Sequence, residues 1–142
     1  MRCLLIEHDS GLVLIDNGAG NKENEKFHDI YAVENAGEGA SAARAGGHGA
    51  PTQLEDGLRK LGVTPNDIDI MIDTHLHFDH AGGNTTVCED GAIVPTFPKA
   101  RYVVQRGEYE YATHTNERTA ASYFPHNFVP VHEAGHDDFV DV

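Results

Sequence analysis

Three histidines and two aspartates fall within eight consecutive residues of this chain, in the stretch DTHLHFDH, which two glycines follow after one alanine. Four of these side chains form the pattern HxHxDH: His75, His77, Asp79 and His80. Because residues two apart in an extended segment project to the same side, the first three can converge on one region. The fourth can reach a neighbouring point once the chain turns, which the glycines permit.

Neutral imidazole and carboxylate are donors that zinc accepts, at about 2.0–2.2 Å. The spacing offers two donors to one ion and two to another, so it predicts one or two zinc ions, with other divalent transition metals as alternatives. Paired ions about 3.5–4 Å apart can hold a hydroxide and polarise an electrophile at neutral pH. The alternative is a solvated histidine-rich turn, which does not explain why a buried-strand pattern precedes the cluster.

The segments before the cluster predict the elements that position it. Two short apolar runs, at 2–8 and 11–16, are separated by a DSG turn signal and predict a β-hairpin. Leucines at 54, 58 and 61 predict a helix over 52–61, with a capping box formed by Thr52 and Glu55.

Residues 68–74 switch to a period of two and predict a strand, with Ile68, Ile70 and Ile72 on one face. Asp69, Met71 and Asp73 fall on the other face. The histidine cluster therefore lies just past the carboxyl end of a strand, where α/β sheets present their ligand sites.

The remaining segments are less regular. Residues 17–51 are glycine-rich and predict either a loop over a site or an insertion, in which FHDIYAV could form a short element. Downstream, the patterns predict a strand at 100–105, a helix over 107–124 and an extended segment over 127–142. No domain boundary is evident, so residues 1–142 are expected to form one α/β domain.

Charge and cysteine usage disfavour several classes of function. Ten Lys and Arg residues against 23 Asp and Glu give a formal charge of −13, which disfavours nucleic acid and anionic membrane partners. No apolar run approaches the roughly 20 residues of a membrane-spanning helix. Cys3 and Cys88 lie far apart without CxxC spacing, so neither a disulfide framework nor a thiolate zinc site is expected. A cytoplasmic location follows as an expectation.

A second histidine motif, HEAGH at 132–136, matches HExxH, which binds zinc only when a helix presents both histidines on one face. Pro130 precedes the motif and Gly135 lies inside it, so a helix is not expected there. The alternative is that His136 supplies a Gly-His metal ligand, although its flanking residues do not fit. The other histidines show no ligand spacing.

The stretch THLHFDHAGGN resembles the metal-binding signature of the metallo-β-lactamase-fold hydrolases, in the branch that contains N-acyl-homoserine lactonases and glyoxalase II-like hydrolases. GLVLIDNGAG resembles the second strand of that family and its Asp-x-Gly turn, and ARYVVQRGEYEYA resembles a later strand and helix. The resemblance implies an α/β fold of the metallo-β-lactamase-like αββα sandwich type, of which residues 1–142 form roughly the N-terminal half.

The resemblance also implies roles for individual residues. His75 and His77 would bind the first metal ion, and Asp79 and His80 the second. Asp79 would in addition be catalytic, because it takes a proton from the metal-bound water or passes one to the leaving group. Asp16 would orient the metal loop through hydrogen bonds; the alternative is an ordinary polar strand end before a turn.

The implied function is that of a zinc-dependent hydrolase fragment, in which a metal-activated hydroxide attacks the carbonyl of a small-molecule lactone, ester or thioester. The family's third histidine in a Gly-His motif, its bridging aspartate and its last histidine are not recognisable here, so a second chain could complete the site. The alternatives are a metal-binding fragment or interaction module without catalysis and, disfavoured by the charge, a metal-dependent phosphodiesterase.

Overall fold

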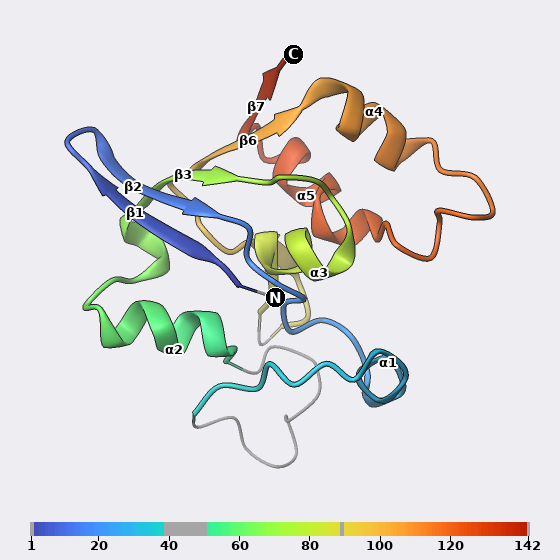
Figure 1. Ribbon diagram of the computed structural model, residues 1–142, viewed down its shortest axis with the longest axis horizontal. Helices are drawn as coiled ribbons and strands as arrows, with labels where there is room; N and C mark the ends of the chain where they lie inside the picture. Colours follow the sequence, from blue (N-terminus) through green and yellow to red (C-terminus); the bar gives the residue numbers. More distant parts are fainter. Residues whose placement is uncertain (1, 39–50, 89, 142) are drawn as a thin grey trace.

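The computed structural model of the chain describes residues 2–38, 51–88 and 90–141 and confirms the predicted α/β class (Figure 1). Its strands are β1 (Leu4–His8), β2 (Gly11–Ile15), β3 (Ile68–Ile72), β4 (Thr85–Val87), β5 (Ile93–Pro95), β6 (Arg101–Gln105) and β7 (Asp137–Val140). Its helices are α1 (Glu25–Tyr31), α2 (Gln53–Lys60), α3 (Phe78–Ala81), α4 (Arg106–Thr113) and α5 (Val129–Glu133), with 3-10 turns at η1 (Pro65–Asp67), η2 (Gly82–Asn84) and η3 (Pro125–Asn127).

The larger sheet has the strand order β1-β2-β3-β6-β7, and β4 pairs with β5 separately. β1 and β2 form the predicted antiparallel hairpin, whereas β2, β3, β6 and β7 run parallel. The carboxyl ends of these four strands therefore share one edge of the sheet. Asp16 follows β2, the histidine cluster follows β3, and α4 follows β6, so the topology brings all three to that edge.

One face of the sheet is covered by the protein core. Its central buried cluster joins the strands to α2 and α5 and contains Leu14, Leu58, Ile68, Met71, Phe97, Ala100, Tyr102 and Val131. The predicted capping box starts α2: the Thr52 side chain accepts from the Glu55 amide, and the Glu55 carboxylate accepts from the Thr52 amide. The cap fixes where the helix begins. Leu54 and Leu58 form the apolar face of α2 that meets the core.

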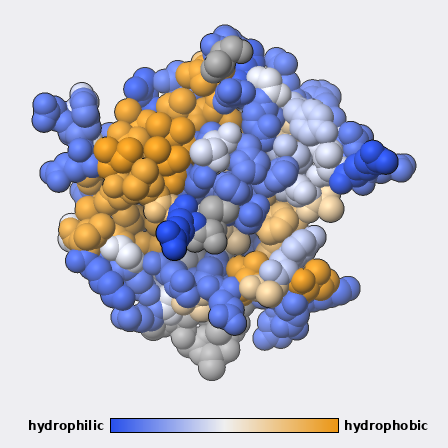
Figure 2. Space-filling model, in the orientation of Figure 1, coloured by the Kyte–Doolittle hydropathy of each residue, from blue (hydrophilic) through white to orange (hydrophobic). Residues whose placement is uncertain are grey.

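The opposite face of the sheet is apolar and open. The strand registers place seven apolar side chains on it: Leu4, Ile6, Val13, Ile15, Ile70, Ile72 and Val103. Leu4 is 56% exposed and Ile6 38% exposed, and the other five are partly exposed. Figure 2 shows an apolar area over the hairpin on this side of the molecule. We call these seven side chains the open face.

The strand predicted at 68–74 is present as β3, but its two faces differ from a simple alternation. Ile68 and Met71 are both buried, whereas Ile70 lies on the open face. The cause is an irregularity in the pairing of β2 with β3, where the Asp69 carboxylate accepts a hydrogen bond from the Leu12 amide at 2.8 Å. A shift of one residue moves a side chain to the other face of the sheet.

Two predictions downstream are wrong in part. The helix expected over 107–124 ends at Thr113, because Asn116 and the residues after it form turns in which its side chain accepts from the Arg118 amide. The segment expected to be extended over 127–142 contains α5 before it reaches β7. Pro130 lies in the first turn of α5, where its missing N–H is not needed.

Within the glycine-rich segment 17–51, the short element expected around FHDIYAV is present as α1. Residues 39–50, which include most of the Gly/Ala-rich part of that segment, lie outside the described residues. No helix in the described part of the chain is long and apolar enough to cross a membrane.

We expect residues 1–142 in isolation to self-associate through the open face, because apolar side chains of this extent favour contact with another apolar surface. The double substitution Leu4→Lys/Ile6→Lys should lower the concentration dependence of the sedimentation coefficient. Leu61→Lys is the matched control, since Leu61 is 68% exposed but lies on the α2 side of the sheet. A chain that stays monomeric at all concentrations before substitution would contradict this prediction.

Candidate metal centre

The four side chains of the HxHxDH pattern gather in the segment that follows β3. The ring centroids of His75 and His77 are 4.5 Å apart, and those of His75 and His80 are 3.9 Å apart. Asp79 Oδ2 lies 3.7 Å from His80 Nε2. The structure therefore brings together all four residues that the sequence singles out.

The local backbone explains this convergence. The chain is extended up to His77, which has φ −61° and ψ 149° and immediately precedes α3. The single turn of α3 then carries Asp79 and His80, and η2 begins at Gly82. Between the first two histidines, Leu76 is 1% exposed and points into the core. An extended stretch followed by one helical turn thus presents the polar side chains on the side away from the core.

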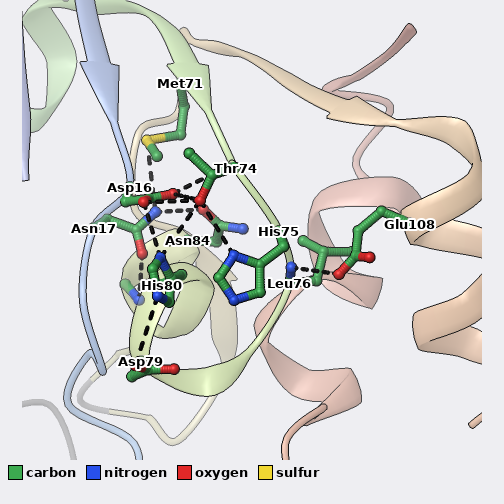
Figure 3. A network of polar contacts seen from close by, with 11 residues as sticks. Asp16, Asn17, Met71, Thr74, His75, Leu76, Asp79, His80, Asn84 and Glu108 are labelled. Carbon is green, nitrogen blue, oxygen red and sulfur yellow. Dashed lines mark hydrogen bonds and ion pairs between the residues drawn. The ribbon is translucent and has the colours of Figure 1, made fainter. Parts of the chain in front are cut away.

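Asp16 connects the end of β2 to this segment (Figure 3). Its carboxylate accepts from the Thr74 amide and the Thr74 hydroxyl, each at 2.9 Å, and its Oδ2 lies 2.9 Å from His80 Nδ1. Asp16 has a left-handed backbone with φ 53°, a conformation that Asp tolerates better than most residues. With Nδ1 held by Asp16, His80 presents Nε2 toward Asp79, as in metal-ligating histidines whose other nitrogen is fixed by a carboxylate.

A buried polar network lies behind the histidines. The Asn17 side chain donates to Asn84 Oδ1 and accepts from the Gly83 amide at 2.7 Å. The Asn84 amide in turn donates to Asp73 Oδ2 at 2.8 Å. Burial raises the pKa of Asp73 to about 8, and the hydrogen bond from Asn84 opposes that shift. The network ties the turn after β2, the end of β3 and η2 into one unit.

Glycines allow the backbones of these segments to touch. A Cβ on Gly20 would lie 2.1 Å from the carbonyl oxygen of Gly82, and one on Gly82 would lie 2.4 Å from the Ala19 carbonyl. The Gly83 amide donates to the Gly18 carbonyl at 3.0 Å, so this contact is a hydrogen-bonded one. The glycines that follow the histidine cluster are therefore required by close packing, whereas the turn itself does not require glycine at Gly82, whose backbone is right-handed with φ −62°.

Lys22 completes this contact from the buried side. Its Nζ donates to the carbonyl oxygen of Thr85 at 2.7 Å and to that of Gly82. Burial lowers the pKa of Lys22 to about 7, and the neighbouring Glu23 opposes the shift. A neutral amine keeps two N–H donors, which is the number of carbonyl acceptors it meets here.

The donor set fits a divalent transition metal by its chemistry. Burial, and then the neighbouring rings of His80 and His77, lower the pKa of His75, which favours the neutral imidazole that binds metals. The Thr74 hydroxyl lies 3.2 Å from His75 Nδ1. The other ring nitrogen, Nε2, is therefore the one that could bind a metal ion. Among the described residues, however, no three His, Cys, Asp or Glu side chains lie in an arrangement that could hold a metal ion.

The HEAGH motif does not form a second such cluster. α5 ends at Glu133, and Gly135 has φ 73°, so His132 and His136 do not share a helix face. The His132 side chain pairs with Asp137, and His136 Nδ1 lies 3.1 Å from the Ala100 carbonyl oxygen. Each ring is thus engaged by a different neighbour.

Sequence reasoning did not identify four polar residues that hold the cluster in place, namely Asn17, Lys22, Asn84 and Glu108. Asn17 and Asn84 had a signal in the sequence around them, because Asn17 belongs to an Asn-Gly pair after β2 and Asn84 to the GGN sequence after the cluster. Lys22 and Glu108 carry no local signal, since their partners lie about 60 and 32 positions away in the chain.

The sequence profile of the metallo-beta-lactamase superfamily matches residues 2–142. The chain belongs to this superfamily. An N-acyl homoserine lactonase of Bacillus thuringiensis is 33% identical over 131 residues, which is 87% of this chain and 44% of the relative. A second one, from Agrobacterium fabrum, is 39% identical over 57 residues, which is 40% of this chain and 18% of the relative.

Solved structures agree with this assignment. A probable metal-dependent hydrolase from Staphylococcus aureus superposes with a TM-score of 0.74 at 27% identity, over 96% of this chain and 42% of that chain. An N-acyl homoserine lactone hydrolase with N-hexanoyl-L-homoserine bound at its catalytic metal centre superposes with a TM-score of 0.54 at 28% identity. The match covers 99% of this chain and 46% of that chain. This member of the metallo-beta-lactamase superfamily thus spans less than half the length of these relatives, in agreement with a partial metallo-β-lactamase-like fold.

Lys22→Met should change how stability depends on pH. Because the pKa of Lys22 is about 7 in the folded chain and about 10.5 when unfolded, the unfolded chain binds more protons between these values. This residue therefore makes the free energy of unfolding rise with pH in that window, by up to about 1.4 kcal/mol per pH unit. Urea titrations at pH 8 to about 9.5 should show that this contribution is absent from Lys22→Met.

Lys26→Met is the matched control for this comparison, since Lys26 is exposed four residues further along the chain. It should leave the pH dependence of unfolding as it is. Equal slopes for the unsubstituted chain and Lys22→Met would contradict the prediction and would place a fully charged ammonium at this buried position.

Proposed function

We propose that this chain is the metal-binding part of a zinc-dependent hydrolase that acts on the carbonyl of a small-molecule lactone. The observation that carries the proposal is the convergence of three imidazoles and Asp79 at the carboxyl edge of the parallel strands, with His80 held by Asp16. His75 and His77 would hold one ion, and Asp79 and His80 a second.

The choice of a lactone is supported by the relatives. Several curated relatives at 33–34% identity are named N-acyl homoserine lactonases, and they match 81–87% of this chain. Esters and thioesters share the reacting carbonyl with lactones and remain candidate substrates. Zinc is preferred among divalent metals because imidazole and carboxylate donors suit it.

The chain's own residues would divide the work as follows. When bound, zinc supplies a Lewis acid for the carbonyl oxygen and hydroxide at neutral pH. Asp79, whose side chain is 48% exposed, can accept a proton from the attacking water and return it to the leaving group. Asp16 and Thr74 keep His80 in one orientation while this happens.

A second candidate function is metal binding without catalysis by this chain alone. It is favoured by the absence of a closed three-donor site among the described residues. Two donors for each ion also fall short of the three protein ligands that catalytic zinc sites keep. On either proposal, a second half or another chain would supply the remaining donors.

We expect residues 1–142 to retain well under two zinc ions per chain after dialysis, because two protein donors hold an ion weakly. Metal content by mass spectrometry and hydrolysis of N-hexanoyl-homoserine lactone would test this. Two tightly held ions together with rapid lactone turnover would contradict it and would indicate that copies of the chain complete one another's sites.

The role of Asp79 is best tested in a polypeptide that unites this chain with the further ligands. Asp79→Asn keeps the side-chain shape but loses the negative charge and the proton acceptor. We expect loss of the second metal ion and a fall in kcat of about 10²-fold or more. Zinc content and the rates with a lactone and a thioester are the measurements.

His132→Ala, in the HEAGH motif, is the control and should leave zinc content and rate nearly unchanged, since His132 pairs with Asp137 outside the cluster. If His132→Ala removes zinc while Asp79→Asn has no effect, the metal site is at HEAGH and the proposed function is wrong.

A further inference from the structure

The peptide between the first two histidines is held by a residue from another element. The Leu76 amide donates to Glu108 Oε1 at 2.8 Å, a contact between positions 32 apart in the chain (Figure 3). The Leu76 side chain is 1% exposed and packs in a buried cluster that also contains Val104 and Ala112. The side chain and the amide of Leu76 are thus both fixed, one by the core and one by a carboxylate.

The position of Glu108 follows from the sheet. It lies in the first turn of α4, which follows β6 without a loop, and β6 pairs with β3. The carboxylate therefore has a defined position relative to the strand that leads into the histidine cluster. A buried or half-buried carboxylate that accepts a backbone N–H makes a stronger hydrogen bond than a neutral acceptor does.

The neighbouring Tyr123 supports the same arrangement. Its ring meets the ring of His77 edge-on, with centroids 4.7 Å apart and an interplanar angle of 75°. Burial raises the pKa of Tyr123 to about 12, and the Glu108 carboxylate is the second cause of this shift. Glu108 therefore lies close both to the peptide that joins the two histidines and to the ring that packs on the second one.

We propose that Glu108 is a positioning residue that sets the relative orientation of His75 and His77 by holding the Leu76 peptide. The Leu76 N–H belongs to the His75–Leu76 peptide group, so rotation of this group would turn the His75 imidazole relative to Leu76 and to His77, which follows it. The effect of Glu108 on metal binding rests on the proposed function, whereas its effect on the orientation of the two imidazoles does not. Loss of an outer partner of this kind typically lowers metal affinity about 10- to 100-fold.

The test compares Glu108→Ala and Glu108→Gln in the chain without metal. Glu108→Ala removes the acceptor, so amide exchange at Leu76 should accelerate at least tenfold, and the nuclear Overhauser contacts between the His75 and His77 rings should weaken. Glu108→Gln keeps an oxygen acceptor and should restore most of both signals. Glu110→Ala is the control, since Glu110 is exposed on the same helix.

Titration with Co²⁺ alone, followed by visible absorption, then measures the consequence for the metal. We expect Glu108→Ala to weaken Co²⁺ binding about tenfold or more and to change the absorption spectrum, while Glu108→Gln and Glu110→Ala stay near the unsubstituted chain. Thermal unfolding of each variant separates this effect from a general loss of stability.

The outcomes distinguish the two proposals. If ring contacts and Co²⁺ affinity are unchanged in a folded Glu108→Ala, Glu108 does not position the histidines and the inference is overturned. If Leu76 exchange accelerates but the ring contacts persist, the hydrogen bond is only structural, and the inference is again overturned. If the unsubstituted chain binds no Co²⁺ while the ring contacts still depend on Glu108, the proposed function fails and the positioning role stands.

Discussion

The carboxylate of Asp16 ties the segment that carries the histidine cluster to the end of β2. Asp16 is 7% exposed, and its two oxygens meet the amide and hydroxyl of Thr74 and the ring of His80. A buried carboxylate is tolerated only when such donors compensate for its lost hydration. Asp16 directly follows β2, and Thr74 lies just after β3. Because β2 and β3 pair in parallel, the contact between these two residues fixes where the histidines lie relative to the sheet.

Much of this arrangement follows from local patterns. The hairpin, α2 with its cap, and β3 were predictable because their periodicity and caps are encoded within a few residues. The position of the cluster was predictable because it follows β3 directly. The site's supporting residues were not, since Asn17 meets Asn84 at a separation of 67 positions and Glu108 meets Leu76 at 32. Such pairs are created by the strand order, which local periodicity does not specify.

The errors in the predicted elements have a local origin instead. Pro130 and Gly135 suggested an extended segment, but the first turn of a helix accepts proline, and Gly135 terminates the helix with a positive φ. The helix predicted over 107–124 stops early because Asn and Thr side chains bond to nearby backbone. In both cases the residue types were read correctly as ones that interrupt helices. What local sequence did not show was at which position of the helix each of them lies.

The open face and the histidine cluster adjoin the same two strands, β2 and β3. Ile15 and Ile72 lie on the open face, and each immediately precedes a residue of the site edge, Asp16 and Asp73. A layer that covered the open face would therefore end close to the histidine cluster. Covering the apolar surface and delivering further donors to the site are thus geometrically coupled.

The environment of Lys22 also makes this residue a chemical reporter. An amine whose pKa is about 7 is largely uncharged in mildly alkaline solution and is then a good nucleophile. In this structure, however, Lys22 is buried and therefore inaccessible to reagents in solution. It can be acylated only when the segment that carries it separates from the turn after His80. The rate at which a small acylating reagent labels Lys22 would therefore measure how often the contact between Lys22 and the turn after the histidine cluster opens in solution.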